Sequence, residues 1–260
     1  MICVFDCETI PDFNLIREIF GFEGSDADAA AFAMNEQKER SGSDFLPVAF
    51  HQVVAISAVI ADDFGMFVRV SSMEGKNEKE LLSSFLSFID RKNPKLVSFN
   101  GRSFDMPMLL TRAMRYNLSC PAYFDTDNKE LGKSKWDSYR YRYGDRFHVD
   151  LMDHISDFGA VRGLKLDHLC TMAGLPGKYD IHGAQVMELY LNNEIEKIKE
   201  YCESDTLNTY WLYLKYELLK GNITIEDYKR YIFAMSEKMP PHRGYKKVFA
   251  DAVDKELNIN

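Results

Sequence analysis

Four acidic residues in three short patterns are the part of this sequence best suited to chemistry. Asp6 and Glu8 come at the end of an apolar run. Asp105 follows a second apolar run, and Asp205 lies four residues after Tyr201. Carboxylates gathered from such separate stretches supply the oxygen ligands that Mg²⁺ and Mn²⁺ prefer. A site with two of these cations can cleave phosphodiesters, because the metals activate water and stabilise the leaving oxygen.

Asp6 and Glu8 are predicted to share one face of a strand. Residues 2–5 are apolar and predict a strand leading into the pair. Side chains two positions apart on a strand point to the same side. Two carboxylates on one face repel each other unless they are protonated or bridged by cations. Taken alone, such a pair more often marks two surface acids where a strand turns into solvent.

Asp105 ends a short loop after an apolar run at residues 96–99, which predicts a buried strand. Within the loop, Gly101 permits a tight turn or a positive φ, and Asn100 can fix the loop through its amide. Ligands bind at this edge of an α/β sheet, where a strand ends and a helix begins. The simpler explanation for Asp105 is an acid that stabilises the dipole of the following helix.

Tyr201 and Asp205 are predicted to project from one face of a long helix, because residues four apart are neighbours on a helix surface. Ile198 and Cys202 lie close to this face, which is therefore expected to turn inward. A buried carboxylate needs a partner or a metal, and a structural Tyr–Asp hydrogen bond is the alternative. Each pattern alone has an ordinary explanation. The three together, each on a suitable element, favour one shared metal site.

The sequence around these residues predicts strands and helices that form a mixed β-sheet between layers of helices. Strands are expected at residues 2–5, 53–60, 65–70, 96–99 and 147–149, the second and third forming a hairpin. Helices are expected at residues 78–89, 104–117 (with Ser103 as N-cap), 151–158, 164–173, 185–191, 194–219 and 224–235. This order predicts an α/β fold with helices on both faces of the sheet and a helical C-terminal third.

The domain organisation follows from the same pattern. Residues 1–220 are predicted to form one domain, with inserts at 21–47 and 120–146. The insert at 21–47 could cover the site or have no role in it. Residues 221–260 are expected to add a helix and, from Pro240 onward, a polar peripheral tail, packed on the domain or extending from it.

Composition narrows the function classes. A net charge of −8 argues against tight, nonspecific binding to duplex DNA, which depends on many basic contacts to phosphate. No apolar run approaches the ~20 residues that span a membrane, and the start of the chain is not a signal peptide. The five cysteines include no CxxC pair. We therefore expect reduced thiols and a cytoplasmic location.

Three motifs resemble those of the DEDD exonuclease superfamily: Asp6-Cys7-Glu8-Thr9, Asn100-x-x-x-Phe104-Asp105 and Tyr201-x-x-x-Asp205. The tyrosine of the third motif is typical of the DEDDy branch. The closest resemblance, over roughly residues 1–220, is to the predicted 3′–5′ exonucleases related to the proofreading domain of family B DNA polymerases. No polymerase domain follows, so we expect a stand-alone nuclease.

This resemblance implies a ribonuclease H-like fold and two divalent cations, Mg²⁺ or Mn²⁺. It implies that Asp6, Glu8, Asp105 and Asp205 are the metal ligands. Tyr201 would orient the attacking water or help to deprotonate it. An ordinary tyrosine pKa of about 10 makes the phenol a poor base at neutral pH, which favours orientation.

The residues beside these motifs are candidates for substrate contacts. Thr9 would hydrogen-bond to the terminal nucleotide and Ile10 would touch it through apolar contact. Phe104 would stack on a base or pack in the core. Asp150 and Asp153 are two further acids that could approach the metals or bind a third ion. The favoured interpretation is that Asp150 caps the next helix and Asp153 is exposed.

The stretch from residue 129 to residue 146 interleaves cations with aromatic rings, as single-strand-binding proteins do. The alternatives are a mobile, solvated loop or a β-segment whose tyrosines pack inward. Arg102, close to Asp105, is a further cation expected to meet a phosphate. The candidate nucleic-acid contacts are Asn100, Arg102, Lys133, Lys135, Trp136, Arg140, Tyr141 and Arg142.

The sequence therefore predicts a metal-dependent 3′–5′ exonuclease that releases nucleoside 5′-monophosphates. Its expected partner is single-stranded nucleic acid, DNA rather than RNA. One alternative keeps the fold but acts on RNA or short oligonucleotides. Another is a nucleic-acid-binding subunit that is catalytically silent, and the four intact acids argue against it.

Overall fold

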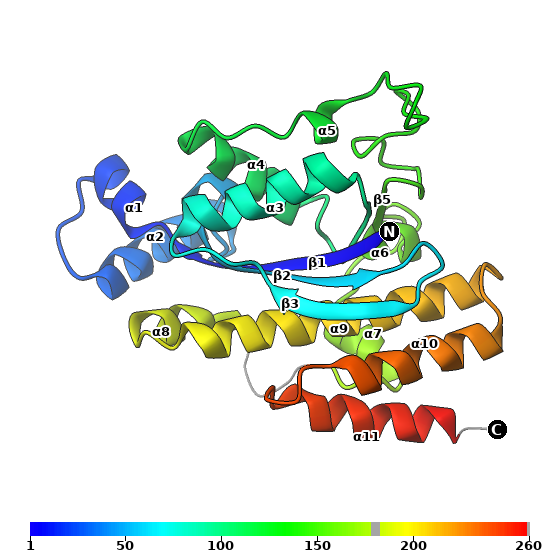
Figure 1. The fold of residues 1–260 in the computed structure, drawn as a ribbon. Coiled ribbons are helices and arrows are strands. Elements are labelled where there is room, and N and C mark those ends of the chain that lie inside the picture. Colours follow the sequence, from blue (N-terminus) through cyan, green and yellow to red (C-terminus); the bar gives the residue numbers. More distant parts are fainter. Residues whose placement is uncertain (178–182, 259–260) are drawn as a thin grey trace.

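A five-stranded sheet forms the centre of the protein in the computed structural model, which describes residues 1–177 and 183–258 (Figure 1). The strand order is β3-β2-β1-β4-β5. The β1–β2 and β2–β3 pairs are antiparallel, and the β1–β4 and β4–β5 pairs are parallel. The predicted mixed sheet is therefore confirmed. The strands are β1 (Ile2–Pro11), β2 (His51–Ala61), β3 (Phe67–Ser72), β4 (Lys95–Ser98) and β5 (His148–Asp150).

Strand β1 is longer than the apolar run at its start. It continues through Asp6 and Glu8, which pair with β2 opposite Ser57 and Ala55. The register shifts between Glu8 and Thr9, so a bulge follows the second acid. Bulges of this kind re-aim side chains and increase local twist. The polar end of the predicted strand is therefore part of the sheet.

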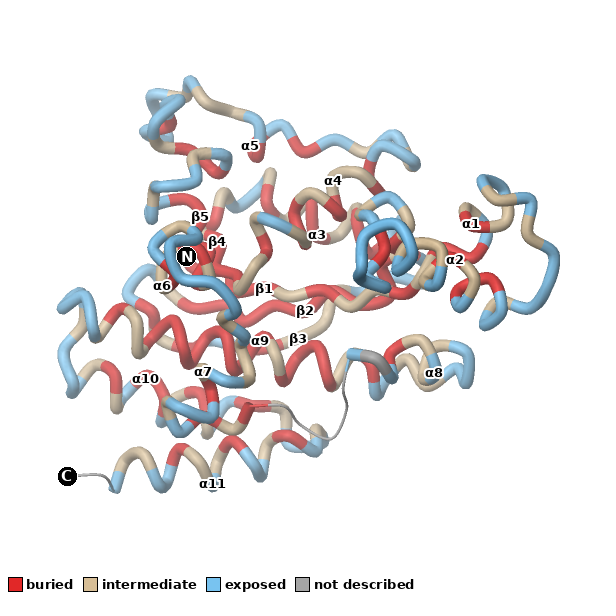
Figure 2. The backbone as a smooth tube through the Cα atoms, turned by 180° about the vertical axis from the view of Figure 1, so that it is seen from behind, coloured by how far each residue is buried: buried red, intermediate tan, exposed pale blue. Residues whose placement is uncertain are grey.

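Helices cover both faces of the sheet (Figure 1). Helices α3 (Glu78–Lys92) and α4 (Asp105–Arg115) lie on one face, and α9 (Ile195–Leu219) runs along the other. Successive side chains of β1 point to opposite faces of the sheet. Phe5 packs in the hydrophobic cluster beneath α3 and α4, and Val4 packs in the cluster beneath α9. Figure 2 shows the resulting burial of the central strands. Both faces of β1 are thus covered, as central strands require.

The C-terminal region differs from the predicted polar tail. Helix α10 (Ile225–Lys238) is followed by α11 (Tyr245–Leu257), and both pack beside α9 (Figure 1). Tyr245, Phe249 and Val253 of α11 are buried in the same core cluster as α9. Their spacing of four residues gives one apolar helix face. The expectation of a peripheral tail was wrong because this stripe was overlooked among polar neighbours.

The two predicted inserts take different forms. Residues 21–47 contain α2 (Asp26–Ser41), which packs with α1 (Phe13–Phe20) around a small cluster of its own. Residues 125–146 form turns and isolated bridges instead of the alternating strand considered above. The shorter helices are α5 (Pro121–Phe124), α6 (Leu151–Ile155), α7 (Leu166–Met172) and α8 (Val186–Leu191). None of the described helices combines the length and apolar character needed to cross a bilayer.

Candidate active site

Asp6 and Glu8 point from β1 toward α9, on the same face of the strand as predicted. One carboxylate oxygen of each and the Cys202 sulfur lie within 4.8 Å of one another. The Cys202 thiol also donates a hydrogen bond of 3.4 Å to the Asp6 carbonyl oxygen, which joins α9 directly to β1. Cys202 was predicted only to lie near the inward face of the helix, and its place in this cluster was not predicted. Its position next to Tyr201, three residues before Asp205, was the available signal.

Asp105 is buried at the first position of α4, where a loop from β4 delivers it. The backbone N–H groups of Asn100 and Arg102 donate to the Asp150 carboxylate at 2.9 and 2.8 Å. The same carboxylate caps α6 by accepting from Met152 N at 3.0 Å. The predicted cap is therefore confirmed, and Asp150 has a second role that was not predicted. It holds the loop that positions Asp105.

The conformation of this loop depends on two neighbouring residues. Asn100 adopts a positive φ of 67°, which asparagine tolerates better than most residues. A β-carbon on Gly101 would lie 2.5 Å from Ser98 Cβ and Oγ, so glycine is required by close approach. Ser103 does not cap α4: Phe104 occupies the N-cap position, without a side-chain hydrogen bond. The cap prediction for Ser103 was wrong because the Asp150 carboxylate organises this turn instead.

Tyr201 and Asp205 lie on the buried side of α9, where their side chains share a hydrogen bond. Ile198 and Cys202 are buried beside them, so the predicted inward face is confirmed. Tyr201 is also buried, and its hydroxyl oxygen lies 3.9 Å from the position of a β-carbon on Gly183. The helix therefore brings a phenol and a carboxylate to the strand that carries Asp6 and Glu8.

The four acids form one electrostatic cluster. Burial raises the pKa of Asp6, and the charges of Asp105 and Asp205 raise it further. Burial raises the pKa of Glu8, and the charges of Asp6, Asp205 and Asp105 raise it further. Burial raises the pKa of Asp105 to about 7. Such a cluster favours either protons or cations, because both reduce the repulsion among half-buried and buried carboxylates.

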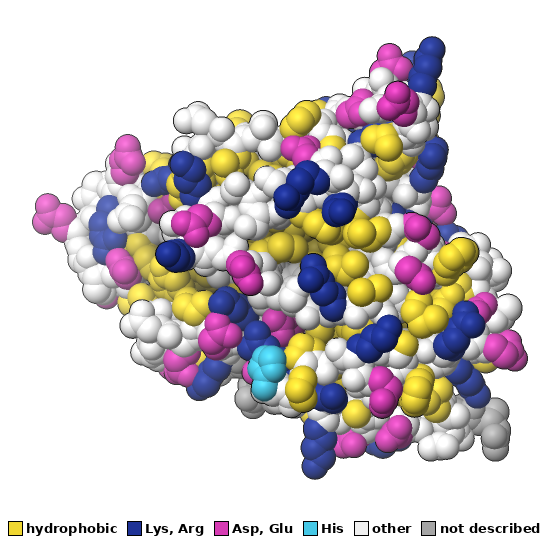
Figure 3. Space-filling view, in the orientation of Figure 1, with side chains coloured by type: hydrophobic (Ala, Val, Ile, Leu, Met, Phe, Trp, Pro, Cys, Tyr) yellow, Lys and Arg dark blue, Asp and Glu magenta, His cyan; other side chains and the backbone are white. Residues whose placement is uncertain are grey.

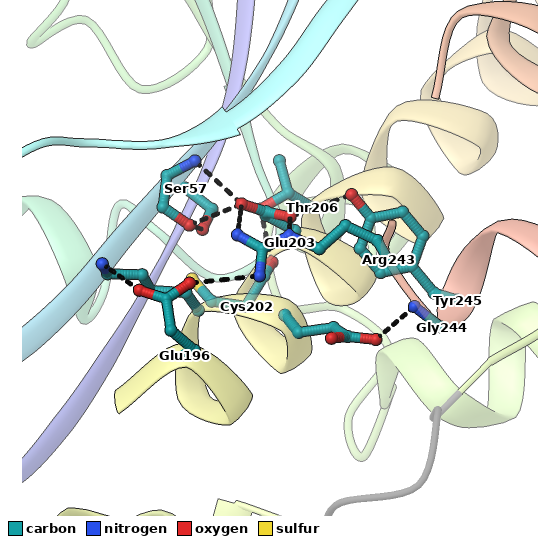
Figure 4. Close-up of polar contacts among 11 residues, drawn as sticks. Ser57, Glu196, Cys202, Glu203, Thr206, Arg243, Gly244 and Tyr245 are labelled. Atoms are coloured by element: carbon teal, nitrogen blue, oxygen red, sulfur yellow. Dashed lines mark hydrogen bonds and ion pairs between the residues drawn. The ribbon is translucent and has the colours of Figure 1, made fainter. Parts of the chain in front are cut away.

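Glu203 is a buried acid on α9 that sequence analysis missed (Figure 4). It accepts hydrogen bonds from Ser72 N at 3.0 Å and Ser72 Oγ at 2.8 Å, on the edge strand β3. From the segment that enters α11 it accepts bonds from Arg243 Nη2 at 3.0 Å and Tyr245 Oη at 2.9 Å. Glu203 thus fixes α9 between the sheet and the C-terminal helix. Glu203 lies two residues from both Tyr201 and Asp205. This anchor therefore fixes the part of α9 that carries the site.

Three predicted contacts beside the motifs have structural partners. Ile10 is buried in a core cluster with Tyr201, so it is not available to a nucleotide. Phe104 packs against the His51 ring at a centroid distance of 4.9 Å, which agrees with the core alternative. Thr9 is half-buried, and its hydroxyl lies 2.9 Å from His51 Nδ1. The correction for Ile10 follows from its alternation on β1, which turns it toward α8 and α9.

Four other predictions are also corrected by their partners. Arg102 donates to the carbonyl oxygens of Tyr139, Tyr141 and His148 at 2.8–3.1 Å, so its guanidinium holds backbone instead of phosphate. The buried Lys133 ammonium donates to the Ala122 carbonyl at 2.7 Å. Arg142 pairs with Asp153 at 2.5 Å, and this acid is buried, not exposed as expected. These charged side chains bind within the protein because the irregular segment at residues 125–146 has few backbone hydrogen bonds of its own. Trp136 and Arg140 remain exposed.

The fold and the carboxylate cluster together indicate an α/β nuclease. The family B DNA polymerase of the hyperthermophilic archaeon Pyrobaculum calidifontis shares the fold, with a TM-score of 0.51 and 19% identity over 96% of this chain and 27% of the polymerase. The chain is also 27% identical to a DNA polymerase of Archaeoglobus fulgidus over 151 residues, 55% of this chain and 19% of the polymerase. It is 26% identical to the catalytic subunit of DNA polymerase epsilon from Aspergillus fumigatus over 145 residues, 54% of this chain and 6% of that protein. These relatives are therefore matched over a minor part of their length.

The chain belongs to the family of predicted 3′–5′ exonucleases related to the exonuclease domain of PolB, whose model matches residues 43–253. Asp105, Tyr201 and Asp205 lie within the matched range. Asp6 and Glu8 precede it, so their inclusion in the site rests on the geometry described above.

Proposed function

We propose that this chain is a metal-dependent 3′–5′ exonuclease that hydrolyses single-stranded DNA from its 3′ end and releases nucleoside 5′-monophosphates. The observation that carries the proposal is the acidic cluster, in which Asp6 and Glu8 converge on Cys202. Burial raises the pKa values of Asp6, Glu8 and Asp105, and repulsion from neighbouring acids in the cluster raises those of Asp6 and Glu8 further. Membership of a predicted exonuclease family supports the same activity. RNA of the same sequence is expected to be the poorer substrate.

The donor set fits hard divalent cations. Asp6, Glu8, Asp105 and Asp205 would hold them, and carboxylate oxygens are the ligands that Mg²⁺ and Mn²⁺ prefer. Bound there, a pair of such ions would lower the pKa of water and offset the charge that develops on the phosphate and the leaving 3′-oxygen. Asp105 is delivered by a loop fixed at Asp150, so its carboxylate is held in place before a ligand binds.

Tyr201 would act by orientation. Burial raises the pKa of its phenol, and the charges of Asp205 and Glu8 raise it further, so the hydroxyl stays protonated at neutral pH. A protonated phenol donates a hydrogen bond and cannot accept the proton of the attacking water. We therefore assign Tyr201 to positioning that water and not to removing its proton.

The test is degradation of a single-stranded DNA oligomer labelled at its 5′ end. With Mn²⁺, the wild-type protein should give a ladder of shortened products, and chelator should stop the reaction. Asp6→Asn should give no ladder, whereas Asp251→Asn, an exposed acid on α11, should behave as wild type. An oligomer blocked at its 3′ end should resist.

Three outcomes would contradict the proposal. Nicking of circular single strands would indicate an endonuclease. Faster degradation of the matched RNA oligomer would assign the site to RNA. Oligomer binding without turnover, together with no Mn²⁺ binding by calorimetry, would indicate a silent binding protein.

A further inference from the structure

A segment far from the acidic motifs in sequence concentrates positive charge. Residues 129–146 contain six Lys and Arg and three Asp and Glu, in a chain whose net charge is −8. The segment follows α5 and projects from the body at the upper right of Figure 1. Figure 3 shows basic and hydrophobic side chains together on this projection, with acids among them. Local charge of this kind attracts polyanions even when the whole protein is acidic.

The six cations of this segment divide into three that hold it together and three without a side-chain partner among the described residues, Lys129, Lys135 and Arg140; the last two lie beside aromatic rings. Three of the six bind within the protein. Lys133 donates to the Ala122 carbonyl oxygen, Arg142 pairs with Asp153, and Arg146 pairs with Asp137. Lys135 and Arg140 are exposed, and neither forms a hydrogen bond or ion pair through its side chain with the residues that the structure describes. Their charges are therefore available to phosphate.

Each of these two cations lies over an aromatic ring. The Lys135 ammonium is 5.0 Å from the centre of the Trp136 ring, and the Arg140 guanidinium carbon is 5.4 Å from that of Phe124. A cation beside a ring face matches nucleic acid, in which a phosphate accompanies each base.

Exposed aromatic residues lie in and beside the segment, whereas Tyr139 within it is buried. The side chains of Trp136, Tyr143 and Phe124 are 66%, 60% and 50% exposed. The Trp136 and Tyr141 rings are 5.9 Å apart, and the Tyr141 and Tyr143 rings are 6.0 Å apart. These contacts continue to the Phe158 ring, 4.7 Å from that of Tyr143. Because these rings already contact one another, little side-chain freedom remains to be lost on binding.

The segment is fixed to the loop that carries Asp105. Arg102, three residues before Asp105, donates to the carbonyl oxygens of Tyr139 and Tyr141 at 2.9 and 3.1 Å. Trp136 is three residues before Tyr139, so its backbone lies within about 11 Å of that anchor. The exposed rings therefore keep a set position relative to the acidic cluster.

We propose that Lys135, Trp136, Arg140, Tyr141 and Tyr143 form a second contact surface for single-stranded nucleic acid, here called the stacking surface. It would hold the strand on the 5′ side of the nucleotide being removed: bases stack on Trp136 and Tyr143, and phosphates lie at Lys135 and Arg140. This inference rests on the proposed function for its substrate. Single strands suit the surface because unpaired bases expose their faces to aromatic rings, whereas duplex DNA conceals them.

The binding test uses the chain's own tryptophans, of which there are two. Trp211 is buried, so an oligothymidylate titrated in chelator should quench the fluorescence of Trp136 alone. Trp136→Ala should weaken binding about 10-fold, measured by anisotropy of a labelled oligomer. Trp136→Phe should retain most of the affinity, because an aromatic face remains. Phe64→Ala is the matched control, since Phe64 is 77% exposed on the β2–β3 turn.

Kinetics with substrates of two lengths complete the test. For a long single strand, Trp136→Ala should raise KM about 10-fold and leave kcat unchanged. For a dinucleotide, which is too short to reach the stacking surface, both constants should match wild type. Equal effects on the two substrates, or unchanged affinity of Trp136→Ala for the oligomer, would overturn the inference. A wild-type protein that binds the oligomer through Trp136 but never shortens it would overturn the proposed function and leave the stacking surface standing.

Discussion

Replacing Asp105 with asparagine should stabilise the metal-free protein while removing its activity. Asp105 is buried, and burial raises its pKa from 3.8 to about 7. In the unfolded chain the carboxyl ionises above about pH 4, whereas in the folded protein it keeps its proton until about pH 7. Folding therefore takes up a proton in this interval, and stability falls as the pH rises from about 4 to about 7. Above that range the loss is complete.

The magnitude follows from the size of the shift. A difference of about three pKa units between the unfolded and folded states corresponds to about 4 kcal/mol of unfolding free energy. Asparagine has nearly the same shape and keeps one oxygen acceptor, but it does not titrate. Asp105→Asn should therefore match wild type near pH 4 and exceed it by about 4 kcal/mol near pH 8.

Urea denaturation in chelator at the two pH values measures this effect. The gap between variant and wild type should widen from acid to alkaline pH, whereas the exposed Asp251→Asn should stay within ~0.5 kcal/mol of wild type throughout. Added Mn²⁺ should stabilise wild type more than Asp105→Asn near pH 8, because the cation replaces the proton. A gap that is independent of pH, or a variant less stable than wild type near pH 8, would refute the electrostatic reasoning.

Four other substitutions test the site and its surroundings. Asp6→Asn should abolish nucleotide release, whereas Tyr201→Phe should lower it only about 100-fold, because the ring still packs and only the hydroxyl is lost. Arg243→Met should lower the unfolding free energy by about 3 kcal/mol in urea, because it leaves the buried Glu203 carboxylate without its cation. Gly101→Ala should reduce the rate while far-ultraviolet circular dichroism stays native, because the new methyl group would meet a serine of β4 at 2.5 Å.

The sequence predicted the sheet and the helices that carry the acids because these elements are local. Strand β4 has the apolar residues Leu96 and Val97 at its centre, and α9 places Tyr201 and Asp205 on one face through its own repeat. The long strand β1 was only half predicted, because acidic residues inside a sheet contradict ordinary propensity. They are tolerated there because β2 pairs with β1 at both acids, beyond the residues that pair with β4, and because the acids face α9 near Cys202.

The residues that sequence analysis misplaced depend on distant partners. Arg102 carries a charge three residues from Asp105, which suggested phosphate, but its hydrogen-bond acceptors are carbonyl oxygens of residues 139–148. Glu203 gave no signal, because its partners lie on β3 and at the start of α11. Local patterns identify groups that can do chemistry. They do not reveal which groups are already occupied by segments many residues away.

The placement of these occupied residues has a physical reason. A cluster of buried acids destabilises the elements that carry it, so each element needs an anchor outside the cluster. Asp150 accepts backbone hydrogen bonds that hold the Asp105 loop, and Glu203 fixes α9 to β3 and to the C-terminal helix. Both anchors are themselves acids, and each accepts hydrogen bonds from several N–H or O–H groups. The same residue type thus has two roles: a carboxylate that accepts several hydrogen bonds holds elements together, whereas carboxylates that crowd one another favour protons or cations.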